Sequence, residues 1–462
     1  MTATADSQSL KHFIERRILL GRPLTTELTA ILLVYFVQGI LGLARLAISF
    51  FLKDDLGLSP ATVAALTGVA TLPWTIKPLF GFLSDGLPLF GYRRRPYLVL
   101  SGLMGTAAWL VLATLAHTVW LATAMILLSS VSIAIADVIV DSLVVERARQ
   151  ESQGEVGTLQ SLSWGTSALG GVLTAYLGGL LLDQTSPRTV FAVTATFPLI
   201  VSVVAWLITE EPITKNTSFK VVQNQVQQLK AAFSQRAIWM PALFLFLWQS
   251  TPSADAAFFF FTTNDLGFEP EFLGRVRLVT SLSALVGIAV FQRFLKAVPF
   301  RTIFAWSTIL ASLGGMSTLL LVTHVNRTLG IDDHWFSLGD SAILTVMGQI
   351  AFMPVLVLSA RLCPTGVEAT LFALLMSIVN LASLLSHELG ALLTQWLHVT
   401  ETDFANLWLL VTVTNLTTLL PLPLLFLLPN TSASAETAPL EAVEDALTPE
   451  DATSPKPALT SP

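Results

Sequence analysis

Long apolar stretches recur along this chain, and they limit its possible folds more than any other feature. Each has about 20 residues, enough for an α-helix to cross roughly 30 Å of hydrocarbon at about 1.5 Å per residue. In lipid every backbone polar group must find a partner within the protein, and the stretches are too long and too continuously apolar for barrel strands. We therefore predict an all-α integral membrane protein with twelve transmembrane helices. They span residues 27–50, 61–83, 97–117, 119–144, 157–182, 188–209, 239–262, 273–295, 300–322, 337–361, 367–397 and 404–428.

The composition agrees with this class of protein. Hydrophobic residues make up 53% of the chain and charged residues only 12%, against roughly 25% charged residues in an average soluble domain. The polar segments hold no phosphate-binding glycine loop, no metal-spaced His/Cys set and no nucleophile motif. The one cysteine, Cys363, cannot form an intrachain disulfide. We therefore expect neither an enzyme nor a protein that holds a cofactor or a metal ion.

One long polar segment, 210–238, divides the spans into two groups of six. We interpret it as a cytoplasmic linker between an N-terminal half, 27–209, and a C-terminal half, 239–428. Its 219–233 part could lie at the membrane surface as a short amphipathic helix, or be a plain solvated linker. A faint repeat after spans four and ten indicates two parallel halves with a site between them at the midplane. The chain ends are predicted as a cytoplasmic arm, 1–26, and a disordered tail, 429–462.

The distribution of positive charge predicts the orientation, because Lys and Arg concentrate in short cytoplasmic loops. With the N-terminus inside, most of the 25 Lys and Arg residues fall on the cytoplasmic side. The outer side receives Lys53, Arg188, Arg275, Arg277 and Arg327, while Arg45 and Lys77 lie within spans. We therefore predict a multi-pass protein of the cell inner (plasma) membrane with both termini cytoplasmic.

The sharpest motif lies between spans two and three. It reads Gly-Phe-Leu-Ser-Asp-Gly at 81–86 and Gly-Tyr-Arg-Arg-Arg-Pro at 91–96, and it resembles the signature of the major facilitator superfamily. Its glycines would let spans two and eleven approach closely, and Asp85 with the arginines would form a cytoplasmic charge latch. The arginines could instead only anchor the topology. We favour the latch, with candidate gating residues Gly81, Asp85, Gly91, Arg93, Arg94 and Arg95.

Ionisable residues inside the spans are candidates for function, because each is costly in lipid unless it is paired or hydrated. Asp137 and Asp141 are i, i+4 neighbours on one helix face, and Lys77 or Arg45 could neutralise them. Two carboxylates in a low dielectric repel each other, which suits a proton carrier. The alternative is a structural ion pair, which we favour for Asp141, leaving Asp137 for coupling or substrate contact. The remaining ionisable candidates are Asp255, His387 and Glu388, and proton coupling is a hypothesis that rests on Asp137, Asp255 and His387.

Span seven is interrupted by polar residues around a proline. Gln249, Pro252 and Asp255 break an otherwise apolar helix, the pattern expected where backbone lines a cavity. A simple kink would explain Pro252 alone, so we predict that this segment lines the substrate path. One or two of the phenylalanines at 258–261 could stack on a flat ligand. Further interior candidates are Thr370 and Asn380 in span eleven and Trp164 in span five, although hydrogen bonds between helices explain such residues equally well.

Several stretches together resemble the folate–biopterin transporter family, within the major facilitator superfamily. They are residues 77–98, 137–149, 159–171, 252–274 and 362–386, and the similarity covers about residues 27–428. The resemblance implies a secondary carrier that moves folates or pterins by alternating access. Lys77 or Arg45 would then hold the glutamate carboxylates of folate, and a carboxylate such as Asp137 would accept hydrogen bonds from the pterin edge. The positions carried over are Lys77, Asp85, Arg94, Asp137, Asp141, Glu146, Arg147, Gln160, Trp164, Pro252, Asp255, Cys363, Glu368, Thr370 and Asn380.

Two other functions remain open at this point. A major facilitator carrier of another small polar solute would keep the Asp85 motif but lack the combinations in spans seven and eleven. A related branch of the superfamily acts in pigment assembly and transports nothing. The expected partners are a small-molecule substrate, membrane lipid and, under the coupling hypothesis, protons; we expect no nucleic acid, and a fold of two halves works as a monomer.

Overall fold

The computed structural model describes residues 22–148, 158–210, 233–362 and 368–430, together with residues 15, 19, 212, 227, 230 and 231. Most of the proposed amphipathic segment, and most of the predicted arm and tail, lies outside this set. Cys363 also lies outside it. Only the backbone is described for Glu146, Gln160, Glu368 and Thr370.

Helices make up almost all of the described chain, as the apolar stretches predict. In the first half they are α2 (Thr26–Ile40), η2 (Leu41–Leu43), α3 (Ala44–Phe50), η3 (Phe51–Asp55), α4 (Pro60–Ala70), α5 (Leu72–Thr75), α6 (Lys77–Gly86), α7 (Arg95–Thr114), α8 (Val119–Ala148), α9 (Thr158–Gln184), α10 (Pro187–Thr194), α11 (Thr196–Val204) and η4 (Ala205–Leu207). In the second half they are α13 (Arg236–Gln249), α14 (Asp255–Asn264), α15 (Pro270–Val290), η5 (Phe291–Leu295), α16 (Phe300–Gly315), α17 (Thr318–Val322), α18 (Val325–Thr328), α19 (Asp333–Arg361), α20 (Glu368–Trp396), α21 (Leu407–Thr417) and η6 (Leu422–Leu427). Among the described residues, 11 helical segments are long and apolar enough to cross a membrane.

The seventh predicted span is helical in two pieces. α13 ends at Gln249 and α14 begins at Asp255, and neither piece is long enough to cross a membrane alone. The backbone between them finds partners on α20. The Ser253 amide donates to the Ser386 carbonyl (3.2 Å), and the Ser386 hydroxyl donates to the Thr251 carbonyl (2.6 Å). With this broken seventh span, the described residues form the twelve predicted spans, and the break lies at the proline that the sequence marks.

The second span is also discontinuous, which the sequence prediction missed. Its pieces α4, α5 and α6 are separated at Thr71 and Ile76. Pro73 and Pro78 account for the breaks, because a proline lacks the amide donor and has a fixed φ that suits the first turn of a new helix. Lys77 is consequently the first residue of α6, beside a break in the middle of the span.

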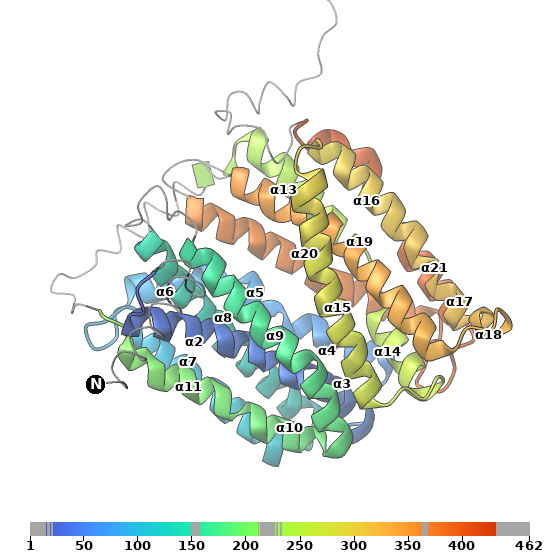
Figure 1. Cartoon of the computed structure of the whole chain (residues 1–462), viewed down its shortest axis with the longest axis horizontal. Helices are drawn as coiled ribbons and strands as arrows, with labels where there is room; N and C mark the ends of the chain where they lie inside the picture. The colour runs from blue at the N-terminus through green and yellow to red at the C-terminus, as the bar shows by residue number, and fades with distance from the viewer. Residues whose placement is uncertain are drawn as a thin grey trace, which may run out of the picture.

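The helices form two groups that follow the order of the chain (Figure 1). α9 packs on α15 and α4 packs on α20, and these contacts join the two groups. Glycines make both contacts possible. A Cβ at Gly179 would lie 2.6 Å from the Gly274 Cα, and a Cβ at Gly68 would lie 2.8 Å from a Glu388 carboxylate oxygen. Spans two and eleven therefore meet closely at Gly68, and not at the motif glycine Gly81 as we expected.

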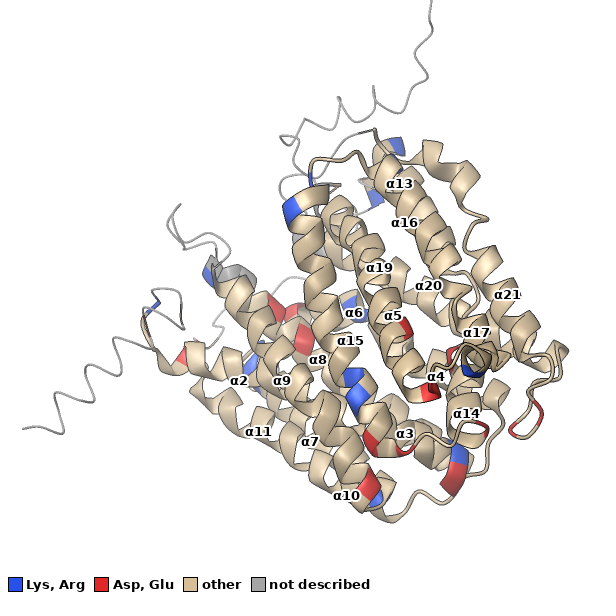
Figure 2. Cartoon of the chain, turned by 45° about the vertical axis from the view of Figure 1, so that its right-hand side comes forward, with Lys and Arg blue, Asp and Glu red and all other residues tan. Residues whose placement is uncertain are grey.

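Charged residues gather at the ends of the bundle, and a few lie in its middle on α6, α8 and α15 (Figure 2). The end that carries the arginine motif and Glu210 is called the linker end, and the opposite end, which carries Lys53 and Asn264, the far end. At the far end the two halves touch. Lys53 Nζ donates to Asn264 Oδ1 (2.7 Å), and the Phe50 and Phe259 rings meet edge to face with centroids 5.3 Å apart.

Candidate transport site

A charged cluster lies in the N-terminal half, where α2, α6 and α8 meet. Lys77 forms an ion pair with Asp137, and its Nζ lies 4.0 Å from Asp141 Oδ2. The Tyr35 hydroxyl donates a hydrogen bond to Asp141, and Lys77 Nζ lies 5.0 Å from the centre of the Trp74 ring. The structure thus brings together three residues that the sequence singles out, and adds a tyrosine and a tryptophan that it does not.

Arg45 takes no part in this cluster. Its side chain is exposed on α3, and its guanidinium makes no hydrogen bond or ion pair with the described residues; only its carbonyl accepts one, from Ser49 (3.4 Å). Of the two cations that we expected to neutralise the aspartate pair, Lys77 alone does so.

A cavity of about 640 Å³ with several polar side chains in its wall lies in the C-terminal half. The predicted residues Gln249, Pro252 and Asp255 all line it, and so does Phe258. The carboxylate of Asp255 makes no hydrogen bond or ion pair within the described part of the chain; its backbone amide bonds to the Ser253 hydroxyl (3.1 Å). The break in span seven therefore places an unpaired acid in the wall of a cavity.

Asp340, on α19, is a cavity residue that sequence reasoning missed. It accepts hydrogen bonds from the hydroxyls of Ser317 and Thr318, the latter at 3.0 Å. These hydroxyls lie where α16 ends and α17 begins. The available signal was an aspartate inside the predicted span 337–361, the same criterion that selected Asp137.

The span-eleven candidates lie at the joint between the halves. Asn380 Nδ2 donates to the Trp74 carbonyl across that joint (3.2 Å), and His387 and Glu388 pack against Gly68 of α4. Thr370 is in α20, but its side chain is outside the described set. Trp164, on α9, is 52% exposed, and nothing is described of the neighbouring Gln160 side chain.

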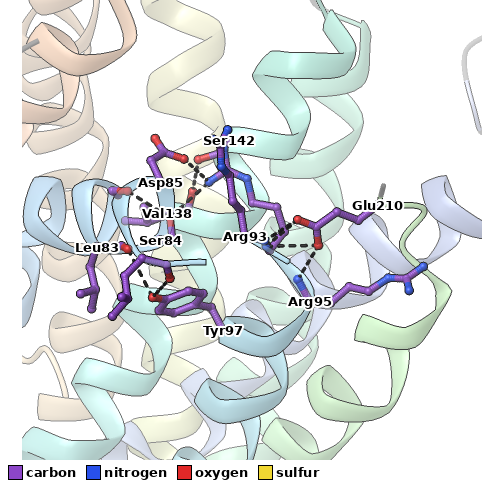
Figure 3. Close-up of polar contacts among 12 residues, drawn as sticks. Leu83, Ser84, Asp85, Arg93, Arg95, Tyr97, Val138, Ser142 and Glu210 are labelled. Carbon is purple, nitrogen blue, oxygen red and sulfur yellow. Dashed lines mark hydrogen bonds and ion pairs between the residues drawn. The ribbon is translucent and has the colours of Figure 1, made fainter. Parts of the chain in front are cut away.

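The motif at the linker end holds an ion pair within one half (Figure 3). Arg94 Nη1 lies 3.0 Å from Asp85 Oδ1 and donates to the Ser84 hydroxyl (3.2 Å). The Arg94 residue is only 7% exposed, so its guanidinium is largely screened from water and interacts with Asp85 and Ser84. The acid–arginine contact that the motif predicts is therefore present, with both partners in the N-terminal half.

Glu210 is the residue at this end that sequence reasoning missed (Figure 3). Its carboxylate accepts hydrogen bonds from the backbone amides of Arg93 (2.6 Å), Arg94 (3.0 Å) and Arg95 (3.0 Å). These amides precede and begin α7, so an acid caps the helix where its free donors and dipole favour negative charge. The residue was treated as the start of the linker.

The motif glycines act locally. A Cβ at Gly81 would meet Val138 of α8 at 3.6 Å, an ordinary contact within the same half. Gly91 has φ +83° and follows Phe90 at φ +52°, while Leu89 and Tyr92 exchange two backbone hydrogen bonds of 2.9 Å. This is a tight two-residue turn, and it requires glycine for its left-handed backbone.

The remaining gating candidates are only partly described. Arg147 Nη2 pairs with Glu27 Oε1 of α2 (2.7 Å). The side chains of Glu146 and Glu368 and the whole of Cys363 lie outside the described set.

Two arginines that we counted on the outer side lie in the first turns of α15. Arg275 pairs with Glu271 one turn earlier (2.6 Å). Arg277 is half-buried, and its guanidinium makes no hydrogen bond or ion pair with any described residue; only its carbonyl accepts bonds from hydroxyls. Both lie within the predicted span 273–295, near its first residues.

Comparison with known proteins identifies the family. The BT1 family model matches residues 38–444. The chain is 60% identical over 423 residues to a folate-biopterin transporter of Synechocystis sp., covering 92% of this chain and 86% of the relative. It is 34% identical over 402 residues to probable folate-biopterin transporter 2 of Arabidopsis thaliana (85% and 80% covered) and 30% identical over 421 residues to folate transporter 2 of Plasmodium falciparum (89% and 91% covered).

Solved structures share the fold at low sequence identity. A nucleoside transporter superposes with a TM-score of 0.65 at 12% identity, covering 86% of this chain and 98% of its own. A D-xylose–proton symporter does so with a TM-score of 0.65 at 13% identity, covering 88% and 100%. The chain therefore has the fold of the major facilitator superfamily and is a membrane transporter rather than an enzyme, and it belongs to the BT1 family.

Proposed function

We propose that this chain moves folates and pterins across the cell inner (plasma) membrane by alternating access, as a monomer with both termini in the cytoplasm. The observation that carries the proposal is the 60% identity with the Synechocystis folate-biopterin transporter over nearly the whole chain. On this proposal the linker end, with its three arginines, is cytoplasmic and the far end is outer.

The C-terminal cavity suits the flat polar ring that folates and pterins share. Its volume of about 640 Å³ lies within the roughly 300–1,000 Å³ typical of small-molecule sites. The ring presents N–H donors along one edge, and a carboxylate such as Asp255 can accept two of them. Phe258 and Trp248 line the same cavity and offer faces for stacking.

The Lys77–Asp137 pair is the candidate for proton coupling. A proton on Asp137 would cancel the attraction to Lys77 and free the lysine, so protonation and helix contacts would change together. Asp141 shares the site through Tyr35 and Lys77. The proposed gate consists of Asp85, Arg93, Arg94, Arg95, Glu146, Arg147, Cys363 and Glu368.

The test is uptake of labelled folate and biopterin into proteoliposomes, with and without an imposed pH gradient, beside an Asp137→Asn variant. Accumulation that needs the gradient and is lost in the variant is the expected result. Uptake unchanged when an uncoupler collapses the gradient would remove proton coupling but keep the substrate class. No uptake of either compound would remove the substrate class.

A further inference from the structure

Two arginines that have no side-chain partner within the described residues lie on helices that both pack against α9 between the halves. Arg45 belongs to α3 of the N-terminal half and Arg277 to α15 of the C-terminal half. Neither guanidinium makes a hydrogen bond or ion pair with a side chain or carbonyl of the described residues, so neither positive charge is balanced by an anion there.

The backbone contacts at the junction explain this placement. A Cβ on Gly178 of α9 would lie 2.8 Å from the Leu43 carbonyl, two residues before Arg45. The next residue of α9 packs directly against Gly274 of α15. Arg277 follows Gly274 by three residues and so lies on the same face of α15, one turn further along. The glycines bring α3, α9 and α15 together, so both arginines lie beside this junction.

The neighbouring arginine, in contrast, has a partner. Arg275 is held by Glu271 at 2.6 Å, and Glu271 also accepts a hydrogen bond from the Tyr176 hydroxyl of α9 (3.0 Å). That carboxylate is therefore already used. Arg277, two residues later, has no such partner within the described chain.

The site adjoins the C-terminal cavity. The Thr280 hydroxyl donates to the Arg277 carbonyl (3.0 Å) and lines the cavity. Asp255 lines the same cavity. A ligand with a ring at one end and an acidic group at the other could therefore reach an unpaired acid and a pair of unpaired arginines at the same time.

We propose that Arg45 and Arg277 form an anion site that binds the two carboxylates of the glutamate tail of folate. The inference rests on the proposed function and deepens it, because it assigns the tail to one site and the ring to another. Each guanidinium presents a planar fork of donors that matches a carboxylate. A dicarboxylate supplies the two negative charges that these cations lack, and a tail-free pterin supplies none.

The first test compares folate with biopterin, which has the ring but no glutamate. Arg45→Gln and Arg277→Gln should each raise the folate concentration for half-maximal uptake by about tenfold or more, as expected for loss of a charge-assisted contact. Biopterin uptake should change by less than about twofold, which also shows that the variants are folded. Arg275→Gln, the matched control, should change neither. Equal loss of both substrates, or unchanged folate uptake, would overturn the proposal.

The second test does not depend on transport. N-(4-aminobenzoyl)glutamate carries the tail without the pterin ring, and 4-aminobenzoate lacks the second carboxylate. The first compound should raise the Tm of the purified protein in detergent by about 2 °C or more at ten times its Kd, and the second should not. Arg277→Gln should abolish the effect. No stabilisation of the wild type would overturn the anion site even if folate is transported, whereas stabilisation without folate uptake would keep the site and remove the proposed substrate.

Discussion

Lys77 and Asp137 neutralise each other in a place where either charge alone would be costly. Their side chains are only 19% and 15% exposed, so water could stabilise either charge only weakly if its partner were removed. Lys77→Met should therefore abolish uptake and lower the free energy of unfolding by about 3 kcal/mol, because it leaves an unpaired carboxylate in a poorly hydrated site. Thermal unfolding in detergent and uptake into proteoliposomes measure the two effects.

The double variant Lys77→Met/Asp137→Leu separates stability from transport. With both charges removed, the unfolding temperature should return close to that of the wild type, while uptake stays absent. A double variant as unstable as the single one would show that the pair does not act through charge compensation.

At the scale of single residues, sequence could select the unusual side chains but not their partners. Asp137 and Asp141 are visible as a helical i, i+4 pair, whereas Lys77 lies 60 positions away from Asp137 and meets it only through the packing of α6 on α8. Arg277 was counted with the outer-side charges, and the sequence does not show that its side chain lacks a partner among the described residues. Whether a charged side chain has a partner can be learned only from the folded structure.

At the scale of elements, the N-terminus of α7 depends on an acid from the end of the first half. Glu210 accepts hydrogen bonds from three consecutive backbone amides there. Glu210→Ala should lower the free energy of unfolding by about 2 kcal/mol, because it removes both the acceptors and the favourable charge at the helix end. Asp183→Ala, at an exposed acid near the end of α9, is the control in thermal unfolding and should have little effect. Equal losses in the two variants would argue against capping.

Glycine at position 179 allows α9 and α15 to touch. A Cβ there would lie 2.4 Å from the Pro270 carbonyl, so Gly179→Val should force the helices apart and reduce uptake by about tenfold or more. Gly165→Val makes the same change on the same helix, where an added Cβ has no neighbour within 4 Å, and it should retain uptake. Similar uptake by the two variants would mean that this close approach is not needed for transport.

The two broken spans show where element prediction succeeds and fails. In span seven, Pro252 stands among side chains that are themselves polar, so the break is visible in composition. In span two, Pro73 and Pro78 interrupt a stretch whose sequence is largely apolar. No run of polar side chains like that around Pro252 marks the breaks. The break at Ile76 is therefore seen only in the backbone, although it sets the position of Lys77.

At the scale of the whole molecule, two halves and twelve spans follow from apolar length and the single polar linker. The way the halves meet does not follow, because it depends on small contacts far apart in sequence. Gly68 against Glu388 and Gly179 against Gly274 could be proposed only as glycine-rich faces. Sequence pointed to Gly81, which lies in the motif, and the closest approach of spans two and eleven is elsewhere.

Alternating access requires the halves to part at the end where they now touch. Lys53 and Asn264 join the two halves at the far end (2.7 Å), whereas Asp55 and Arg188 make a contact within the N-terminal half at the same end (3.5 Å). These two pairs allow a matched cross-linking experiment on a Cys363→Ser background, which removes the only native cysteine.

A short, reducible thiol cross-linker across Lys53→Cys/Asn264→Cys should stop uptake, because it holds the halves together at the far end, and reduction should restore it. The same reagent across Asp55→Cys/Arg188→Cys should leave uptake largely intact, since those positions move as one body. Cross-linking is scored in both variants by loss of free thiols, and for the first pair also by a mobility shift after cleavage at the linker between the halves; uptake is measured on the same sample. Continued transport with the first pair fully cross-linked would mean that the far end does not open, and the carrier would need a route that leaves this contact closed.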